Sequence, residues 1–318
     1  QDLDLPAPAG VTDYVVYSDS PEDTQTIVER CQDADIIFTN KIKISAEAIS
    51  NLPKLKLIQL TATGMNNVDS DACDKHGVTL YNVAGYAVKS VPEHTFMLMT
   101  MAMRAAIHYH QKVIDGSWSD DGGFCLLDVP LIDLEDKTLG IIGVGTIGKR
   151  VTQIARAYGM TVLWAEHQGQ TPRNEDYTAF DEVLARSDVI SLHCPLNEDT
   201  KHLINKDTLA KMQKQPLIVN VARGGIVDSQ ALTNAVNNEQ ILGYASDVFE
   251  AEPITEDDPL LSLKDHPRVI FSPHNAWGSE SAQLTLWRIL SKQVSAFIDK
   301  TASVSYTHLR AHETRHDL

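Results

Sequence analysis

A glycine-rich turn constrains this chain more than any other feature. Residues 139–142 form a short apolar run that is typical of a buried parallel strand. Three glycines follow the run in the spacing G-x-G-x-x-G: Gly143, Gly145 and Gly148. After the turn, apolar residues recur at helical spacing: Ile147, Val151, Ile154 and Ala155. The pattern predicts a strand, a tight turn and a helix in immediate succession.

Each glycine of this turn has an expected function. Gly143 permits the tight turn, Gly145 lets the backbone approach a pyrophosphate, and Gly148 lets the helix and the strand pack closely. Free N–H groups at the helix N-terminus would then face the phosphates. The alternative is an ordinary glycine-rich turn before a helix. The flanking strand and helix, and an acid at the distance expected in a dinucleotide-binding unit, favour the first interpretation.

That acid, Glu166, follows a second predicted strand at residues 161–165. A carboxylate there can accept hydrogen bonds from ribose hydroxyls and would repel a 2′-phosphate. The sequence therefore favours NAD over NADP. His167 and Arg173 follow closely enough to leave this preference open.

Composition excludes several classes of protein. The length of 318 residues suggests about two domains. The net charge of −16 argues against a nucleic-acid partner, which needs a basic face. There is no apolar run of ~18 residues and no recognisable signal peptide, so we expect no membrane span. The four cysteines lack C-x-x-C spacing, which predicts free thiols, no metal site and a reducing, cytoplasmic location.

Beyond the glycine-rich unit, predicted strands and helices alternate. In the first third, strands are predicted at residues 11–17, 34–39, 55–60 and 78–82, with helices at 23–32 and 45–51. Later, strands at 189–194, 217–221, 242–245 and 269–271 alternate with helices at 180–185, 206–212 and 229–237. This alternation predicts an α/β fold with parallel sheets covered on both faces.

The middle of the chain holds a long predicted helix and then an irregular segment. The helix, at residues 90–104, has apolar residues that we expect in a core or subunit contact: Val91, Phe96, Met97, Met99, Met101 and Met103. From residue 108 to 130 the pattern is broken, which favours a surface arm or a partner-binding segment. His108 and His110 would point apart on a helix, and we expect neither to be catalytic.

Three chemically useful residues follow predicted strands. Arg223 and His274 come just past two strands, and Glu252 lies in the loop after a third. Ligands bind outside the carboxyl ends of strands in open parallel sheets. Reduction of a ketone by hydride needs a proton donor, which His274 can be; Glu252 would stabilise its imidazolium, and Arg223 can bind a carboxylate bidentately. Each residue alone also fits a structural role, but their joint placement favours catalysis.

One further loop, at residues 61–69, has a composition suited to anion binding. Small residues at Ala62, Thr63 and Gly64 let backbone N–H groups face a small anion such as a substrate carboxylate. The alternative is a plain loop between a strand and a helix.

Six motifs together carry a family resemblance. They are TGMNNVD at 63–69, GVGTIG at 143–148, HCPL at 193–196, VNVARGGIVD at 219–228, DVFEAEP at 247–253 and SPHNAWGS at 272–279. Through them, roughly from residue 11 to residue 300, the chain resembles the D-isomer-specific 2-hydroxyacid dehydrogenases.

The resemblance implies a role for each matching residue. Arg223 would bind the carboxylate and carbonyl of the substrate, His274 would be the acid and base paired with Glu252, and Thr63 and Gly64 would lie in the substrate loop. The matching cofactor contacts, besides the three glycines, are Thr146, Ile147, Glu166, Cys194, Pro195, Val221, Ala222 and Asp247. Asp247 would meet the nicotinamide carboxamide.

The resemblance also implies an activity. We expect NAD(H)-dependent reduction of hydroxypyruvate or glyoxylate, both small 2-keto acids, to the D-2-hydroxy acid. The alternatives are another 2-keto acid, such as a phosphoglycerate-type or lactate-type substrate, and a non-enzymatic NAD-sensing protein like the family's corepressors.

The same resemblance implies two doubly wound, Rossmann-like domains with a cleft between them. Residues 1–98 and 279–302 would form the substrate domain, and residues 99–278 the NAD-binding domain, with a homodimer built partly from an arm at 104–130. The family's first strand has no match, so we expect a missing N-terminal strand. The tail at 303–318 has no family match and is expected to be non-native; its His308, His312 and His316 mimic a metal-binding face, but no further ligand supports one.

Overall fold

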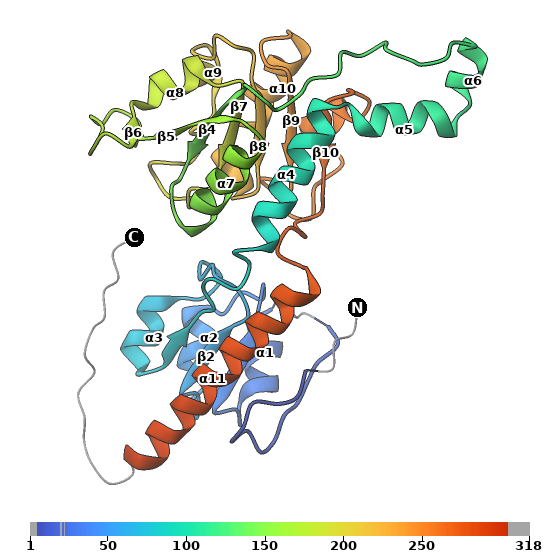
Figure 1. Cartoon of the computed structure of the whole chain (residues 1–318). Coiled ribbons are helices and arrows are strands. Elements are labelled where there is room, and N and C mark those ends of the chain that lie inside the picture. Colours follow the sequence, from blue (N-terminus) through green and yellow to red (C-terminus); the bar gives the residue numbers. More distant parts are fainter. Residues whose placement is uncertain (1–4, 20, 22, 305–318) are drawn as a thin grey trace. The chain divides into compact units, whose positions relative to one another are not determined.

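The computed structural model describes residues 5–19, 21 and 23–304 and divides into two compact units. One unit consists of residues 1–87 and 279–318, and the other of residues 88–278. The division falls after Ala87 and not at residue 98, so the long helix that follows belongs entirely to the second unit. Most of the tail lies outside the described residues, including its three histidines. Each unit is an α/β structure, so the predicted fold class is confirmed (Figure 1).

The first unit is built on a parallel sheet of three strands in the order β1-β2-β3. The strands are β1 (Ile36–Thr39), β2 (Leu57–Leu60) and β3 (Thr79–Tyr81). The helices are α1 (Thr24–Cys31), α2 (Ala46–Ser50), α3 (Ser70–His76) and α11 (Glu280–Val304).

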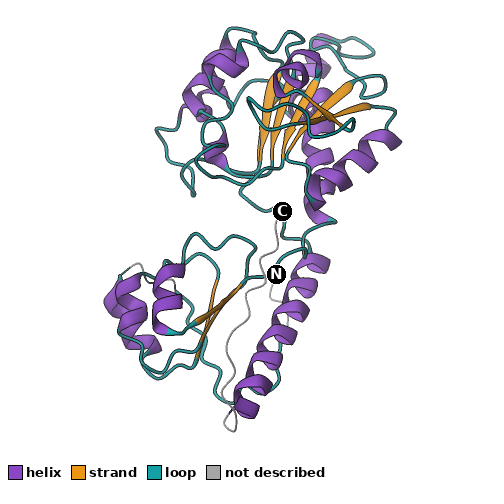
Figure 2. Cartoon of the chain, turned by 90° about the vertical axis from the view of Figure 1, so that its left-hand side faces the viewer, coloured by secondary structure: helices purple, strands orange, loops and turns teal. Residues whose placement is uncertain are grey.

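Both faces of this small sheet are covered. Successive residues of β2 point to opposite faces, so Ile58 packs with residues of α1 to α3 while Leu57 packs with Leu290 and Val294 of α11. Figure 2 shows α11 on one side of the strands and the three shorter helices on the other.

The predicted first strand at residues 11–17 is wrong. The segment forms no strand, and Val15 and Val16 are 69% and 73% exposed. Its composition is typical of a strand, and Val11 contacts the core and Tyr14 contacts Phe38 of β1, but its backbone joins no strand ladder. A strand forms only where its backbone finds a ladder partner, which composition does not reveal.

The second unit contains a parallel sheet of seven strands in the order β10-β9-β8-β7-β4-β5-β6. The strands are β4 (Thr138–Ile142), β5 (Thr161–Ala165), β6 (Tyr177–Thr178), β7 (Val189–Leu192), β8 (Leu217–Asn220), β9 (Gly243–Ser246) and β10 (Val269–Phe271). Only β6 was not predicted, because a two-residue edge strand leaves no readable pattern.

Helices cover both faces of the larger sheet. They are α4 (Ser90–Met103), α7 (Thr146–Ala157), α8 (Phe180–Arg186), α9 (Lys206–Leu209) and α10 (Ser229–Asn237). On one face, Phe96 of α4 and Val151 of α7 share a core with Val189, and on the other, Leu184 and Leu232 pack with Ile190. Neighbouring residues of β7 therefore serve two separate cores, as a strand buried on both faces requires.

Helix α4 buries part of the apolar set that was expected in a core or subunit contact. Phe96, Met99 and Met103 are buried, but Met97 is 42% exposed. Leu98, which was not predicted, is fully buried instead. The helix is apolar on nearly every side, so its sequence alone does not define which face is inside.

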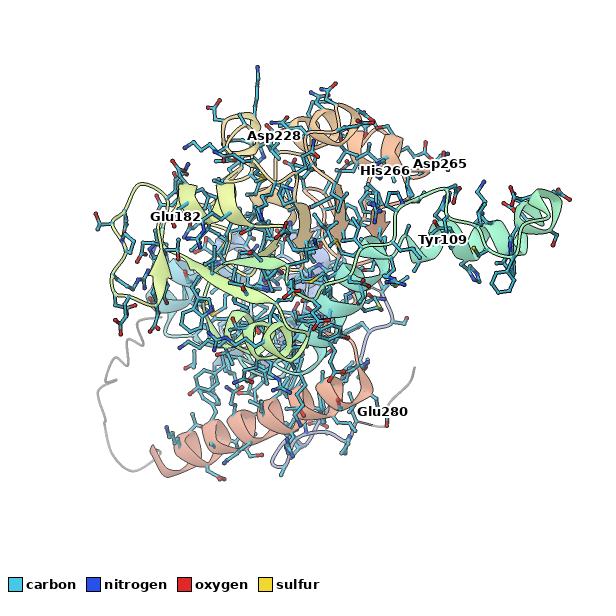
Figure 3. All side chains as sticks on the ribbon, turned by 45° about the horizontal axis from the view of Figure 1, so that its top comes forward. Tyr109, Glu182, Asp228, Asp265, His266 and Glu280 are labelled. Carbon is cyan, nitrogen blue, oxygen red and sulfur yellow. The ribbon has the colours of Figure 1, made fainter. Side chains whose placement is uncertain are left out.

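The segment predicted to be irregular contains two helices, α5 (Ala106–Ile114) and α6 (Ser117–Asp121). Together with the chain to Pro130 they extend away from the sheet, and we call residues 104–130 the arm (Figures 1 and 3). Tyr109 closes it internally, because its hydroxyl donates to the Val129 carbonyl and accepts from the Val129 N–H. The helical pattern was missed because α5 and α6 contain no buried residue.

One buried side chain joins both ends of the arm to the sheet. The Arg268 guanidinium, just before β10, is 4% exposed as a residue. Its Nη1 donates to the carbonyls of Ala102 and Met103 at 2.9 and 2.8 Å, and Nη2 donates to the carbonyl of Pro130. Burial lowers the pKa of Arg268, but the three carbonyls and the C-terminal end of α4 stabilise its charge.

Candidate active site

The three predicted catalytic residues follow three neighbouring strands. Arg223 lies past β8, Glu252 past β9 and His274 past β10, and these strands are adjacent in the sheet. All three strands are parallel, so their carboxyl ends share one edge. The structure thus brings together, within one unit, residues that are far apart in the sequence.

The loop that carries Arg223 is held by its own strand. Asn220, the buried last residue of β8, donates from Nδ2 to the Arg223 carbonyl at 2.9 Å and accepts from the Ala222 N–H at 3.1 Å. The Arg223 Nη1 donates to the Ala222 carbonyl at 2.7 Å. Asn220 was not predicted, although it lies in the VNVARGG motif. A buried amide that satisfies its own loop fixes where the arginine leaves the strand.

His274 and Glu252 form a short, oriented pair. His274 Nδ1 lies 2.6 Å from Glu252 Oε2, and the other carboxylate oxygen accepts the Phe249 N–H at 3.2 Å. A carboxylate can only accept, so Nδ1 carries the proton and Nε2 is the nitrogen left for chemistry. Both side chains are about one quarter exposed, which leaves them accessible to a small molecule.

The backbone at His274 is also constrained. Its φ of 51° lies in the left-handed region, which residues other than glycine adopt in only a small minority of cases. Trp277 Nε1 donates to the His274 carbonyl at 3.0 Å, and the His274 N–H donates to the Ser272 carbonyl at 3.1 Å. An unusual conformation held by its surroundings is common where a side chain must be aimed.

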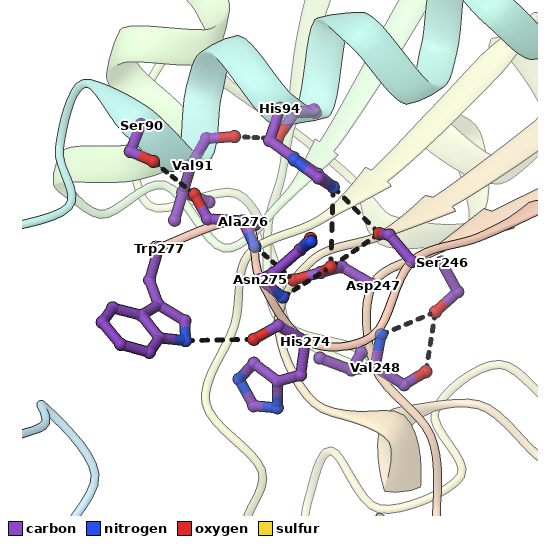
Figure 4. A network of polar contacts seen from close by, with 12 residues as sticks. Ser90, Val91, His94, Ser246, Asp247, Val248, His274, Asn275, Ala276 and Trp277 are labelled. Carbon is purple, nitrogen blue, oxygen red and sulfur yellow. Dashed lines mark hydrogen bonds and ion pairs between the residues drawn. The ribbon is translucent and has the colours of Figure 1, made fainter. Parts of the chain in front are cut away.

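Asp247, which directly follows β9, anchors the loop that carries His274 (Figure 4). It is 1% exposed, and its Oδ1 accepts from the Ser272 hydroxyl at 2.6 Å and the Asn275 N–H at 3.0 Å. Its Oδ2 accepts the Ala276 N–H at 2.9 Å. Three donors on one buried carboxylate fix the path of the chain on both sides of His274.

A further histidine, which sequence reasoning missed, completes this network. His94 Nε2, from α4, lies 2.9 Å from the Ser272 hydroxyl and 3.5 Å from Asp247 Oδ1. Burial lowers the pKa of His94, against the opposing effect of Asp247. The network therefore joins α4 to the ends of β9 and β10.

The glycine-rich turn has the geometry expected for a dinucleotide. Gly143 has a φ of +97°, and a Cβ there would stand 2.3 Å from the Cys194 nitrogen. A Cβ on Gly148 would stand 2.3 Å from the Gly143 carbonyl oxygen, so strand and helix do pack closely. A Cβ on Gly145 would meet nothing within 4 Å. The turn is thus crowded on its inner side and open at the start of α7, where the N–H groups of Thr146 and Ile147 are not used by the helix's own hydrogen-bond ladder.

The other predicted cofactor residues lie at the same edge of the sheet. Cys194 and Pro195 follow β7, and Val221 and Ala222 follow β8. Burial raises the pKa of the Cys194 thiol to about 11, so the thiol is neutral at physiological pH. Glu166 follows β5, but it is 1% exposed and bonded to Arg173.

Thr63 and Gly64 lie in the first unit, in the loop after β2. The Thr63 hydroxyl donates to the Val83 carbonyl at 2.9 Å, and the Asn82 amide donates to the Thr63 carbonyl at 2.7 Å. These bonds fix the loop against the chain that leaves β3.

Known proteins resemble this chain in sequence. Residues 96–276 match the family model described as D-isomer specific 2-hydroxyacid dehydrogenase, NAD binding domain. The chain is 39% identical over 274 residues to a glycerate dehydrogenase from Methylorubrum extorquens, covering 86% of each chain. It is 34% identical over 301 residues to a hydroxypyruvate reductase from Blautia hydrogenotrophica, covering 93% of this chain and 92% of the relative.

The fold has solved counterparts as well. A D-lactate dehydrogenase from Aquifex aeolicus, solved with NAD and lactic acid, superposes with a TM-score of 0.75 at 30% identity, covering 87% of this chain and 86% of that one. Fold and site define an NAD-dependent oxidoreductase. The chain belongs to the D-isomer specific 2-hydroxyacid dehydrogenase family, which confirms the resemblance seen in its motifs.

No helix within residues 5–19, 21 and 23–304 is long and apolar enough to cross a membrane. In the same part of the chain, no three His, Cys, Asp or Glu side chains are grouped so as to hold a metal ion.

Proposed function

We propose that this enzyme reduces hydroxypyruvate to D-glycerate and, as a second substrate, glyoxylate to glycolate, which has no stereocentre. The relatives from Methylorubrum extorquens and Blautia hydrogenotrophica support this substrate class, because their names describe the same reaction in its two directions. When bound, the reduced nicotinamide supplies the hydride.

The proposed mechanism assigns one step to each of three side chains. Arg223 binds the substrate carboxylate, because a guanidinium matches a carboxylate with two parallel hydrogen bonds. His274 gives the proton on Nε2 to the carbonyl oxygen as negative charge develops there. Glu252 keeps the ring oriented and stabilises the imidazolium before the transfer. We also assign a substrate-binding role to the loop of Thr63 and Gly64.

The observation that carries the proposal is the 2.6 Å contact between His274 Nδ1 and Glu252 Oε2. The Phe249 N–H fixes the second oxygen of that carboxylate, so the pair is oriented from its far side. A histidine held in this way has the protonated Nδ1 and the available Nε2 that a general acid requires.

The cofactor assignments rest on the turns and loops at the carboxyl ends of β4, β7 and β8. We assign the pyrophosphate to Gly143, Gly145 and the N-terminal N–H groups of α7. The chain past β7 and β8 would form the walls of the nicotinamide and adenosine sites: Cys194, Pro195, Val221 and Ala222. The contact of Asp247 with the carboxamide stays a prediction beside its role as loop anchor.

Turnover of several keto acids tests the substrate. Oxidation of NADH is followed with hydroxypyruvate, glyoxylate, pyruvate and phosphohydroxypyruvate in turn. The proposal expects the highest kcat/KM with hydroxypyruvate. A higher value with pyruvate or with the phosphorylated acid would reassign the substrate within the family. Tight NADH binding without turnover of any keto acid would contradict the proposal and favour a sensing role.

We also propose that the arm forms a homodimer contact. Its apolar side chains are exposed within the single chain, Phe124 at 97%, Leu127 at 67% and Ile114 at 66%. Exposed apolar area on this scale usually marks an interaction surface. Replacing Phe124 and Ile114 by serine should convert a dimer into a monomer in sedimentation experiments, whereas a wild-type monomer would contradict the proposal.

A further inference from the structure

The acid at the end of β5 is enclosed by its own loop. Glu166 Oε2 accepts Nε of Arg173 at 2.8 Å and the Arg173 backbone N–H at 2.9 Å. Its Oε1 accepts Nη2 of Arg173 and, at 2.9 Å, the His167 N–H. The Arg173 guanidinium holds the pKa of this carboxyl far below its usual range. The carboxylate is therefore charged, neutralised by a partner, and supplied with four donors.

The groups that face outward at this place are basic. The Arg173 side chain is 48% exposed and that of His167 is 68% exposed, against 1% for Glu166. Arg173 Nη2 lies 3.1 Å from His167 Nδ1, so the two side chains adjoin. The guanidinium also lies 4.5 Å from the ring centroid of Tyr177 in β6, which supports it from one side. A ligand at this end of the sheet meets an arginine and a histidine before it meets the acid.

This arrangement changes how the ribose end of a dinucleotide is recognised. An unpaired carboxylate accepts hydrogen bonds from the 2′-hydroxyl and repels a 2′-phosphate. Here the charges of Glu166 and Arg173 cancel, so the repulsion is removed. The guanidinium has five N–H donors, and only those on Nε and Nη2 are directed at Glu166, so Nη1 brings further donors of the kind that bind phosphate.

We propose that Arg173, with His167 beside it, forms a subsite for the 2′-phosphate of NADPH, and that the enzyme therefore binds NADPH as well as NADH. Arg173 is then the residue that determines cofactor specificity. The inference rests on the dinucleotide site at β4, α7 and β5, but not on which keto acid is reduced.

Direct binding tests the inference independently of turnover. NADH and NADPH are titrated into the wild-type enzyme, with binding followed by nicotinamide fluorescence, and 5′-AMP and 2′,5′-ADP are then used as competitors. We expect the Kd for NADPH to lie within about 30-fold of that for NADH, and 2′,5′-ADP to compete at least as well as 5′-AMP. NADPH binding that is weaker than this limit would overturn the proposal.

A single substitution assigns the effect to Arg173. Arg173→Ala should weaken NADPH binding by about 10- to 100-fold, the range of a lost charge-assisted hydrogen bond, and change NADH binding by less than about 3-fold. An equal loss for both cofactors would show that Arg173 only supports the loop, and would overturn the assignment. Thermal unfolding of the variant without cofactor checks that the fold is intact.

Two further variants complete the test. Glu166→Gln removes the negative charge and leaves Arg173 in place, so the ratio of NADPH to NADH affinity should rise. Arg186→Ala is the matched control, because Arg186 forms a similar surface pair with Glu182 on α8. Arg186 precedes β7, so it lies at the amino-terminal ends of the parallel strands, away from the carboxyl ends where Glu166 lies. This control variant should leave both affinities unchanged. A ratio that falls in Glu166→Gln would also contradict the proposal.

Discussion

Gly224 lies so close to Phe249 that a Cβ on the glycine would stand 1.9 Å from the Phe249 carbonyl carbon. This backbone contact joins the loop after β8, which carries Arg223, to the loop after β9, which carries Glu252. It sets the spacing between the loop of Arg223 and the loop whose Glu252 carboxylate pairs with His274. Only a residue without a side chain permits it.

Gly224→Ala is therefore expected to destabilise the enzyme by about 1–3 kcal/mol or more, because backbone atoms have to move to make room. It should also lower kcat/KM by displacing Arg223. Gly145→Ala is the matched control for stability, since its Cβ would meet nothing within 4 Å. Urea unfolding measures both free energies, and a wild-type value for Gly224→Ala would show that the loops separate without cost.

His274→Asn should lower kcat by about 10²- to 10⁴-fold, the usual contribution of a general acid, while NADH affinity stays nearly constant. His202→Asn serves as the control, because His202 forms a comparable pair with Glu250 at 2.9 Å on the surface. Steady-state rates and fluorescence titration separate the two effects. A parallel loss of NADH affinity in His274→Asn would mean that the residue holds the cofactor and does not act as the acid.

Arg223→Lys should raise KM for the keto acid by about 10-fold or more, because an ammonium cannot reproduce the two parallel bonds of a guanidinium. The Kd for NADH should remain at its wild-type value. Initial rates over a range of keto acid concentrations provide the measurement. If KM is unchanged, the substrate carboxylate is bound elsewhere.

His193 should make the enzyme sensitive to acid. Its Nδ1 is buried and has no hydrogen-bond partner among the described residues, while Nε2 lies 2.8 Å from the Ser191 hydroxyl. Burial lowers the pKa of His193 to about 3, against about 6.5 in an unfolded chain. Between these values the unfolded state binds the extra proton, so stability rises with pH across the window and falls by about 1.4 kcal/mol per pH unit on acidification.

His193→Gln should reduce this pH dependence, because glutamine does not titrate. The measurement is the free energy of unfolding of both proteins in urea at about pH 7.5 and about pH 5. His94 also has a lowered pKa, so only the difference between the two proteins is attributed to His193. If the free energy of unfolding changes equally with pH in wild type and variant, His193 is not the source of the acid sensitivity.

Local backbone requirements made part of this structure predictable. The glycines of the turn at Gly143 indicate both the conformation of the turn and the strand and helix on either side of it. Strand β4 and helix α7 form within one or two residues of the prediction. The placement of Arg223, Glu252 and His274 past adjacent strands followed from chain order, because parallel strands bring their carboxyl ends to one edge. In contrast, His94 and Ser272 are far apart in sequence, and only the packing of α4 on the sheet brings them together.

Other features were not predictable for a different reason. Glu166 was correctly placed at the end of β5, but the sequence does not show that Arg173 turns back to cover it. Met97 is exposed on a helix that is apolar on nearly every side, and α5 is helical without burying any residue. In each case the outcome depends on which side chains meet after folding, and residue spacing carries no such information.

The buried Arg268 has a consequence for how this protein can vary. It bonds to Ala102 and Met103, where the chain leaves for the arm, and to Pro130, where the chain returns. The Ile132 N–H also donates to the Met103 carbonyl at 3.1 Å, so a second contact joins the two ends of the arm. The arm therefore starts and ends at one fixed place beside the sheet. Insertions and deletions in the arm can therefore change its exposed surface while the strand ends that carry Arg223, Glu252 and His274 keep their geometry.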